Sequence, residues 1–379
     1  MILSKKDLIE KIKVALAQQT PFVCYRKPND SKITLVQQND DTLNYLQSYS
    51  QTGFVFAPFN TNEKTILFEL KNCNLTNYSN TIIEDSIIKK NDSFENTAIK
   101  EEKHTHEALV EKGITFIQKK ATSKIVLSRK KTLKVKHFNS IQTFLNLLQT
   151  YKTAFVYIWF HPKIGLWFGA TPETLLTIND KNFKTMALAG TQAYKNTLEV
   201  IWEEKEINEQ QIVTNYIGTI LSKLKITYKI SKAHTTKAAN LVHLKSDITG
   251  RINNKEEIAT LIKALHPTPA VCGLPKETAK QFILENENYQ REFYTGFLGE
   301  LNFDIDKRQS KNNKRNIENH AYKFTKKQSN LFVNLRCMQV SKNNIAIYVG
   351  GGITQDSNPE KEYLETVAKA IVMERIIAN

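Results

Sequence analysis

The stretch Thr153 to Gly190 reads TAFVYIWFHPKIGLWFGATPETLLTINDKNFKTMALAG and contains four short runs with strand character. TAFVYIWF and LWFGAT are rich in aromatic and β-branched residues, and the turn HPKIG separates them, which is typical of a β-hairpin. TLLTIND and KNFKTMALAG predict a second hairpin directly after the first. Two successive hairpins favour antiparallel sheets.

Helical patterns lie on both sides of this stretch. Apolar residues recur at helical intervals in the ranges 1–20, 138–151, 197–224 and 358–377, and the last helix has Pro359 in its first turn. A polar stretch near 85–105 is typical of a linker or a loop that leads into a helix. Strands paired close in sequence, with helices between groups of them, indicate an α+β protein with antiparallel sheets.

The composition is that of an ordinary soluble protein, with 41% hydrophobic and 24% charged residues in a chain of 379. No segment approaches the roughly 20 uninterrupted apolar residues that cross a bilayer. The first helix spaces Leu3, Leu8, Ile9, Ile12 and Val14 among charges, unlike the unbroken apolar region of a signal peptide. Four cysteines lie far apart without a CxxC pair, so no zinc site or disulfide framework is implied. We expect a cytoplasmic protein without a membrane partner.

Nearly half of the net charge of +15 lies in one run, and the rest is scattered along the chain. Residues 307–327 carry eight Lys and Arg against one Glu, which predicts a mobile surface loop. A strongly basic chain is typical of proteins that bind nucleic acid or acidic lipid headgroups. However, no aromatic RNA-binding signature or paired-cysteine finger accompanies this charge. We therefore expect no nucleic-acid partner, and we expect a monomer because no exposed apolar stripe demands a second copy.

Two acidic pairs stand out in predicted helices. Glu206 and Glu209 are three residues apart, as are Glu362 and Glu365, so each pair projects from one helix face. Lys369 falls on nearly the same face as Glu365. A single pair of this kind is usually a solvated helix surface. Two pairs that face each other would form an oxygen-rich pocket of the kind that holds magnesium.

Three other features carry chemistry, each with a structural alternative. Gly350 to Gly352 end a predicted strand and allow close backbone approach to a carboxylate, although a tight turn has the same requirement. The strand LFVNLRCMQV places Arg336 on one face with Phe332 and Asn334, where a substrate carboxylate or a structural ion pair would be its partner. Glu173 follows a strand and a proline among apolar neighbours, as a desolvated general acid or as a helix-start acid.

The strand KIVLSRKK begins with Lys124 and alternation places this lysine on the same face as Val126. Lys124 is either one more solvated charge or a group that faces a reaction. A lysine on an inward strand face would lose hydration, which lowers its pKa and leaves some neutral amine near pH 7.

Nine motifs occur in one order along residues 113–379. They are KIVLSR, FGATPETLL, LAGT, KEINEQQIV, LVHL, LHPTPAVCGLP, REFYTGFLG, LRCMQV and GGGITQDSNPEKEYLETVAK. In this order they resemble the chorismate-utilising enzymes, the family of isochorismate, salicylate, anthranilate and aminodeoxychorismate synthases. The resemblance implies one large α+β domain over residues 1–379, with layered antiparallel sheets flanked by helices around chorismate and magnesium. Residues 113–379 would be the catalytic core, and residues 1–112 match more weakly.

The resemblance also separates the reactions of the family. At the position of Lys124 the amine-transferring members carry glutamine, whereas the members that use water carry lysine. The aminodeoxychorismate branch tends to carry a lysine where this chain has Ala189. The resemblance therefore implies that Lys124 is a general base for water attack at C2 of chorismate, with Glu173 as the general acid that protonates the departing C4 hydroxyl.

The resemblance implies the remaining site residues as well. Magnesium would be held by Glu206, Glu209, Glu362 and Glu365. The substrate would be held by Thr191, His243, Tyr294, Arg336, Gly350, Gly351, Gly352 and Lys369. Gln210 departs from the family pattern, since many members have histidine there.

We expect an isochorismate synthase, a magnesium-dependent isomerase. A salicylate synthase, which also expels pyruvate, is the alternative, and a non-catalytic nucleic-acid-binding relative is the alternative from another class. Menaquinone and siderophore pathways both fit the expected product.

Overall fold

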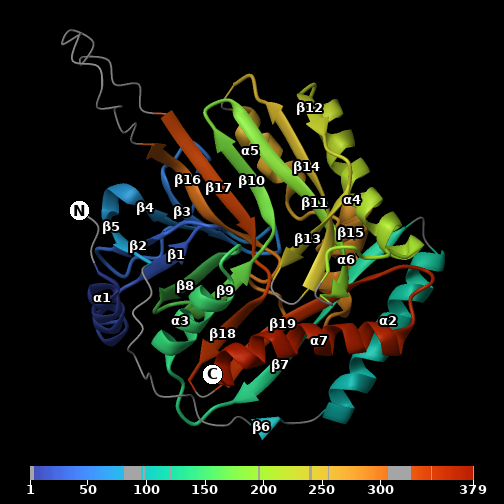
Figure 1. Ribbon diagram of the computed structural model, residues 1–379, viewed down its shortest axis with the longest axis horizontal. Coiled ribbons are helices and arrows are strands. Elements are labelled where there is room, and N and C mark those ends of the chain that lie inside the picture. The colour runs from blue at the N-terminus through green and yellow to red at the C-terminus, as the bar shows by residue number, and fades with distance from the viewer. Residues whose placement is uncertain are drawn as a thin grey trace.

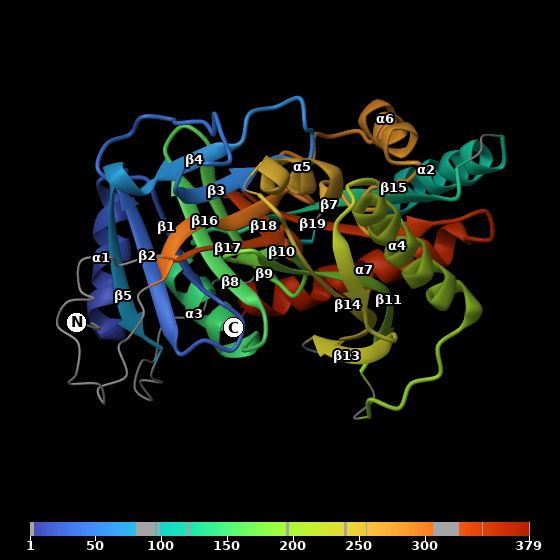
Figure 2. The same ribbon diagram turned by 90° about the horizontal axis from the view of Figure 1, so that it is seen from above.

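The computed structural model describes residues 4–80, 95–96, 99–119, 122–194, 197–238, 241–254, 256–305, 326–342 and 344–378. The helices within these ranges are α1 (Lys5–Ala17), α2 (Ile99–Lys119), α3 (Ser140–Thr150), α4 (Glu204–Lys223), α5 (Glu256–Leu265), α6 (Lys276–Asn286) and α7 (Pro359–Ala378). A 3₁₀ turn, η1 (Leu70–Asn72), adds to them. In both views of the molecule α1 lies at one end and α4 lies towards the other (Figures 1 and 2).

The strands of the described residues form two antiparallel sheets. The ten-stranded sheet has the order β15 (Gly273–Leu274), β7 (Lys124–Lys134), β19 (Asn344–Ile353), β18 (Cys337–Ser341), β9 (Gly165–Thr171), β8 (Phe155–His161), β1 (Phe22–Arg26), β2 (Lys32–Gln38) and β5 (Cys73–Ser79), with β6 (Glu95–Asn96) on β7. The nine-stranded sheet has the order β12 (Thr227–Ile230), β14 (Leu241–Arg251), β11 (Asn182–Ala193), β10 (Thr174–Asn179), β17 (Lys326–Val333), β16 (Phe297–Ile305), β3 (Gly53–Ala57) and β4 (Ile66–Glu69), with β13 (His234–Ala238) on β14. The predicted α+β fold with layered antiparallel sheets is confirmed.

Aromatic side chains join the two sheets. Phe155 of β8 stacks on Phe332 of β17 with ring centroids 4.3 Å apart, and Phe56 of β3 lies 4.9 Å from Trp159 of β8. Such pairs contribute beyond the apolar area that they bury. Apolar faces of α1, α3 and α7 pack on the ten-stranded sheet, and those of α4 and α5 pack on the nine-stranded sheet. The sheets therefore lie between helices, with an aromatic core where they meet.

Both predicted hairpins form, since β8 pairs with β9 and β10 pairs with β11. They belong to different sheets, and the chain crosses from one sheet to the other at Pro172 and Glu173. It crosses back between Val333 and Cys337, so the prediction of one strand face for Phe332, Asn334 and Arg336 is wrong. Arg336 has a φ of 47°, in the left-handed region that interrupts a strand.

Some predicted boundaries also differ from the structure. The helix predicted from residue 197 begins at Glu204, because Glu203 and Glu206 form a capping box that starts it there. Part of the polar stretch near 85–105 lies outside the described residues, but α2 already begins at Ile99. Val14 of the first helix is exposed, and Leu8, Ile12 and Ala15 form its buried face instead.

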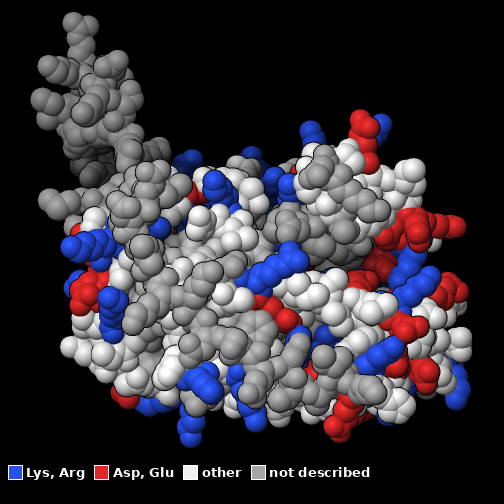
Figure 3. Space-filling view, turned by 60° about the horizontal axis from the view of Figure 1, so that its bottom comes forward, with Lys and Arg blue, Asp and Glu red and all other residues white. Residues whose placement is uncertain are grey.

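The first third of the chain contributes to both sheets, because β1 pairs with β8 and β3 pairs with β16. In the predicted basic loop 307–327, residues 307–325 lie outside the described residues, and Lys326 and Lys327 begin β17. On the face shown in Figure 3, basic and acidic side chains are interspersed. Among the described helices, none is long and apolar enough to cross a membrane.

Candidate active site

A cavity of about 560 Å³ opens between β7 and β19 of the ten-stranded sheet, β11 and β14 of the nine-stranded sheet, and helices α4 and α7. This volume is in the range of small-ligand sites. Its wall contains every predicted site residue whose side chain is described: Lys124, Glu173, Glu206, Glu209, His243, Tyr294, Arg336, Gly350, Gly351, Gly352, Glu362, Glu365 and Lys369. Thr191 lies in β11, but its side chain is outside the described part of the structure.

Lys124 points into the cavity from the first position of β7. Its side chain is 2% exposed, and its Nζ lies 3.4 Å from Oε2 of Glu209. The aliphatic part crosses Gly352, where an added Cβ would meet Cε of Lys124 at 2.7 Å. A glycine at 352 thus provides the space in which the lysine reaches the cavity.

Glu173 is buried at the first sheet crossing. Two hydrogen bonds fix the backbone of Glu173. Its N–H donates to Oγ1 of Thr171 at 3.3 Å, and its carbonyl accepts from the N–H of Val333 at 3.0 Å. Burial raises the pKa of the carboxyl group to about 8, and the positive charge of Lys124 acts in the opposite direction. Near neutral pH the group is therefore mostly a protonated acid that can donate its proton.

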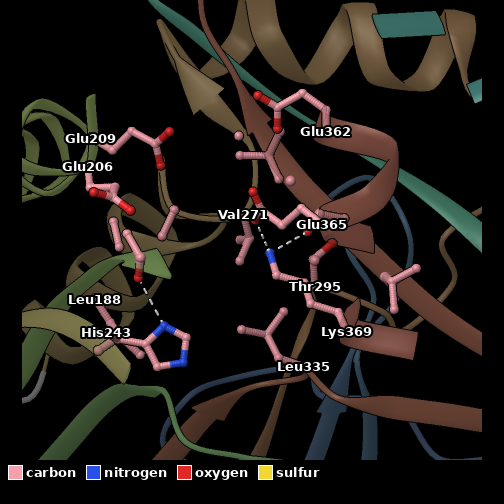
Figure 4. A pocket seen from close by; sticks show the side chains of 18 of the residues that line it. Leu188, Glu206, Glu209, His243, Val271, Thr295, Leu335, Glu362, Glu365 and Lys369 are labelled. Carbon is pink, nitrogen blue, oxygen red and sulfur yellow. Dashed lines mark hydrogen bonds and ion pairs between the residues drawn. The ribbon is translucent and has the colours of Figure 1, made fainter. Parts of the chain in front are cut away.

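The two predicted acidic pairs face the same cavity. Figure 4 shows Glu206 and Glu209 on one side of it and Glu362 and Glu365 on another. Glu206 also caps the N-terminus of α4, because its carboxylate accepts a hydrogen bond from the N–H of Glu203 at 2.7 Å. The pairs come together because α4 and α7 both begin at the cavity.

Lysines neutralise these carboxylates in the structure. Lys205 lies 2.7 Å from Glu362, and Lys369 lies 2.7 Å from Glu365. Burial would raise the pKa of Glu365, but the charge and hydrogen bond of Lys369 outweigh burial and hold the pKa below its usual value. At neutral pH the carboxylate of Glu365 is therefore ionised.

The donor set suits an oxygen-preferring cation such as magnesium. Oε2 of Glu362 is buried and has no hydrogen-bond partner within the described residues. No group of three or more His, Cys, Asp and Glu side chains in this part of the chain is arranged to hold a metal ion by itself. Magnesium usually binds through one or two carboxylates and keeps water or substrate oxygens as its other ligands. The residues thus fit an ion whose coordination is completed by water and substrate.

Arg336 and His243 form a hydrogen-bonded unit at the second sheet crossing. One guanidinium nitrogen of Arg336 lies 3.0 Å from Nε2 of His243, and Nδ1 of His243 lies 3.0 Å from the carbonyl oxygen of Gly190. Because a carbonyl only accepts, Nδ1 carries the proton and Nε2 accepts from Arg336. Burial, and then the charge of Arg336, lower the pKa of His243 to about 3, so the imidazole is neutral.

The three glycines are among the last four residues of β19, as predicted for a strand end, and pair with Ser128, Leu127 and Val126 of β7. Each allows side chains to come close. A Cβ at 351 would lie 3.3 Å from Oε2 of Glu362, and one at 350 would lie 3.0 Å from the hydroxyl of Tyr294. The carbonyl of Gly350 accepts from Nζ of Lys369 at 2.8 Å.

Sequence reasoning missed part of the wall. Lys205 is four residues before Glu209 in α4, and this spacing was a signal that both share a helix face. The apolar residues Leu188, Val271 and Leu335 also line the cavity (Figure 4). All three lie in motifs of the family resemblance, LAGT, LHPTPAVCGLP and LRCMQV, but their apolar side chains carry no chemistry that marks them as wall residues.

The two sheets enclose a cavity whose wall carries a buried lysine, a protonated carboxyl group and two acidic helix pairs that face each other. These features define an enzyme-like site for a small molecule. Comparison with known proteins gives a specific family. Residues 42–306 match a family described as chorismate binding enzyme, and residues 322–375 match a second family model with the same description. The chain belongs to the chorismate-binding enzymes, and the match begins well before residue 113.

Individual relatives agree with this family. The chain is 28% identical over 217 residues to isochorismate synthase DhbC of Bacillus subtilis, which is 55% of this chain and 49% of DhbC. It is 30% identical over 210 residues to isochorismate synthase MenF of Escherichia coli K12, which is 53% of this chain and 43% of MenF. The chain spans about half the length of these relatives. The crystal structure of DhbC from Bacillus anthracis has the same fold, with a TM-score of 0.76 at 20% identity, over 97% of this chain and 99% of that one.

Proposed function

We propose that this protein is an isochorismate synthase, which isomerises chorismate by adding water at C2 and releasing the hydroxyl group at C4. The observation that carries the proposal is the placement of Lys124 and Glu173 on the wall of one cavity, both buried. The names of its relatives DhbC and MenF support the same reaction.

In the proposed reaction the uncharged amine form of Lys124 accepts a proton from a water molecule as that water forms a bond to C2. The ring double bonds shift, and the C4–O bond breaks. Glu173, protonated near neutral pH because burial raises its pKa to about 8, donates its proton so that the hydroxyl group leaves as water. One water is consumed and one is released, and proton exchange with solvent restores both side chains.

The cationic side chains of the cavity would hold the two carboxylates of chorismate. Arg336 is held by neutral His243, so its guanidinium can bind one carboxylate in a fixed orientation. Lys369, fixed by Gly350 and Glu365, adds positive charge nearby. The hydroxyl group of Tyr294 and the backbone of Gly350 to Gly352, which line the cavity, would contribute hydrogen bonds.

Glu209, Glu362 and Glu365, with Glu206 beside them, would hold magnesium. The ion would supply positive charge for the ring carboxylate. The orphaned Oε2 of Glu362 supports this assignment, because a buried carboxylate oxygen without a partner is costly.

Product analysis tests the proposal. Purified protein with chorismate and magnesium, and without an added amine, should form isochorismate and release no pyruvate. Pyruvate released in step with chorismate consumption would instead favour a salicylate synthase. Absence of turnover with magnesium present would contradict both reactions.

A further inference from the structure

Lys205 lies in the first turn of α4 and reaches across the cavity to the first turn of α7. Its Nζ is 2.7 Å from Oε1 of Glu362, and its side chain is 38% exposed whereas that of Glu362 is 3% exposed. The other oxygen of Glu362, Oε2, has no hydrogen-bond partner among the described residues. The ion pair therefore connects α4 to α7 and uses one of the two oxygens of the buried Glu362 carboxylate.

Lys205 is the most exposed of the three lysines that pair with the acidic groups. Lys124, beside Glu209, is 2% exposed and enclosed by β7 and Gly352. Lys369, beside Glu365, is 25% exposed and is also held by the carbonyl of Gly350. The side chain of Lys205 can thus move into solvent at a smaller cost than the other two.

The ammonium group of Lys205 sits among the charges that a divalent cation needs. Burial would lower its pKa, but the hydrogen bond and charge of Glu362, followed by the charges of Glu209 and Glu365, raise the pKa above its usual value. One lysine therefore interacts with three of the four carboxylates that the proposed magnesium site would use.

We propose that Lys205 is an internal counter-ion of the metal site, and that it competes with a divalent cation for the carboxylate of Glu362. This inference rests on the proposed function, because it assumes that the carboxylates hold a metal ion. A cation of the chain and a metal ion that compete for the same oxygens oppose each other by mass action. Lys205 thus weakens metal binding to the free enzyme and holds α4 to α7 while the metal ion is absent.

Binding of Mn²⁺ to the full chain without chorismate, followed by the electron paramagnetic resonance signal of free Mn²⁺, tests the proposal. Lys205→Met removes the charge and keeps much of the aliphatic side chain. It should bind Mn²⁺ about tenfold more tightly than the wild type, the effect of losing one charged hydrogen bond that competes with the metal ion. Lys205→Gln is the second variant if the first does not fold.

The matched control is Lys245→Met. Lys245 is 18% exposed, pairs with Asp247 at 3.0 Å and does not line the cavity, so its loss should leave Mn²⁺ affinity unchanged. In a Glu362→Gln background, replacement of Lys205 should no longer tighten binding, since the shared carboxylate is gone. Equal or weaker Mn²⁺ binding by Lys205→Met, or no Mn²⁺ binding by either protein, would overturn the counter-ion proposal.

Chorismate turnover of the wild type is measured separately and distinguishes the two proposals. Tighter Mn²⁺ binding by Lys205→Met in a protein that forms no isochorismate would support the counter-ion and contradict the proposed function. Isochorismate formation by the wild type, with unchanged Mn²⁺ affinity in the variant, would contradict the counter-ion alone.

Discussion

Lys124 and Glu173 line one cavity although they come from distant parts of the fold. Lys124 opens β7 at one side of the ten-stranded sheet, and Glu173 lies where the chain crosses from β9 to β10 in the other sheet. Both are buried, and the charge of Lys124 offsets part of the rise that burial causes in the pKa of Glu173. A basic and an acidic group are thus held inside the same cavity.

The pH dependence of turnover should report Glu173. Burial raises its pKa from 4.5 to about 8, so the proton it donates is present below about pH 8 and is lost above it. We expect turnover to fall as the pH rises past this value. Replacement by Gln should lower turnover by about 10² to 10⁴ fold and remove this loss. A pH–rate profile checks both points, and unchanged turnover of Glu173→Gln near neutral pH would contradict the role of Glu173.

His243 should act on substrate binding through Arg336. In His243→Phe an aromatic ring remains but the acceptor of the 3.0 Å bond is lost, so the guanidinium of Arg336 loses this contact. We expect KM for chorismate to rise about tenfold with a smaller change in kcat. His234→Phe, at an exposed position of β13, is the control. Wild-type steady-state constants for His243→Phe would show that Arg336 does not depend on this contact.

Metal removal should abolish turnover reversibly. A chelator is expected to stop isochorismate formation, and added magnesium should restore it in the wild type. Glu209→Ala should lose activity and its response to magnesium together, because the carboxylate that faces the cavity beside Lys124 is gone. Normal turnover of this variant at ordinary magnesium concentrations would contradict the assignment of Glu209.

The buried ion pair between Arg291 and Glu287 should stabilise the folded protein. Arg291 donates to both oxygens of Glu287, at 2.8 and 2.6 Å, and to the carbonyl of Val126 in β7 at 2.7 Å. Arg291→Met leaves the buried carboxylate without its cation, which typically costs about 3 to 5 kcal/mol of unfolding free energy.

Urea unfolding measures this change. The control is Lys103→Met, which removes an exposed pair with Glu360 and should leave the unfolding midpoint nearly unchanged. An unfolding free energy of Arg291→Met close to that of the wild type would show that Glu287 finds other compensation.

The sequence predicts those parts of the fold that depend on neighbouring residues. The hairpins around residues 161–165 and 179–182 follow from turn residues between apolar runs, and both form. The break between β17 and β18 does not follow from local pattern, because LFVNLRCMQV alternates as a strand should. It depends on a change of sheet and a left-handed Arg336, which only the tertiary structure determines.

The candidate active site is likewise predictable from the sequence only in part. Ordered motifs identify the charged residues, and the structure brings those with described side chains to one cavity. A lysine near a helix start is usually a solvated charge, so the only sequence signal for Lys205 is its spacing to Glu209, which places both on one helix face. Leu188, Val271 and Leu335 have no distinguishing chemistry, so their place in the wall required the structure.

The role of Lys124 as the base for water is tested most directly by isotope incorporation. Chorismate and magnesium are incubated with the wild type and with Lys124→Gln in water enriched in oxygen-18, and the oxygen at C2 of the product is analysed by mass spectrometry. We predict one oxygen-18 atom at C2 in the wild-type product and no labelled product from Lys124→Gln. Unlabelled isochorismate from the wild type, or labelled isochorismate formed at an unchanged rate by the variant, would contradict this role.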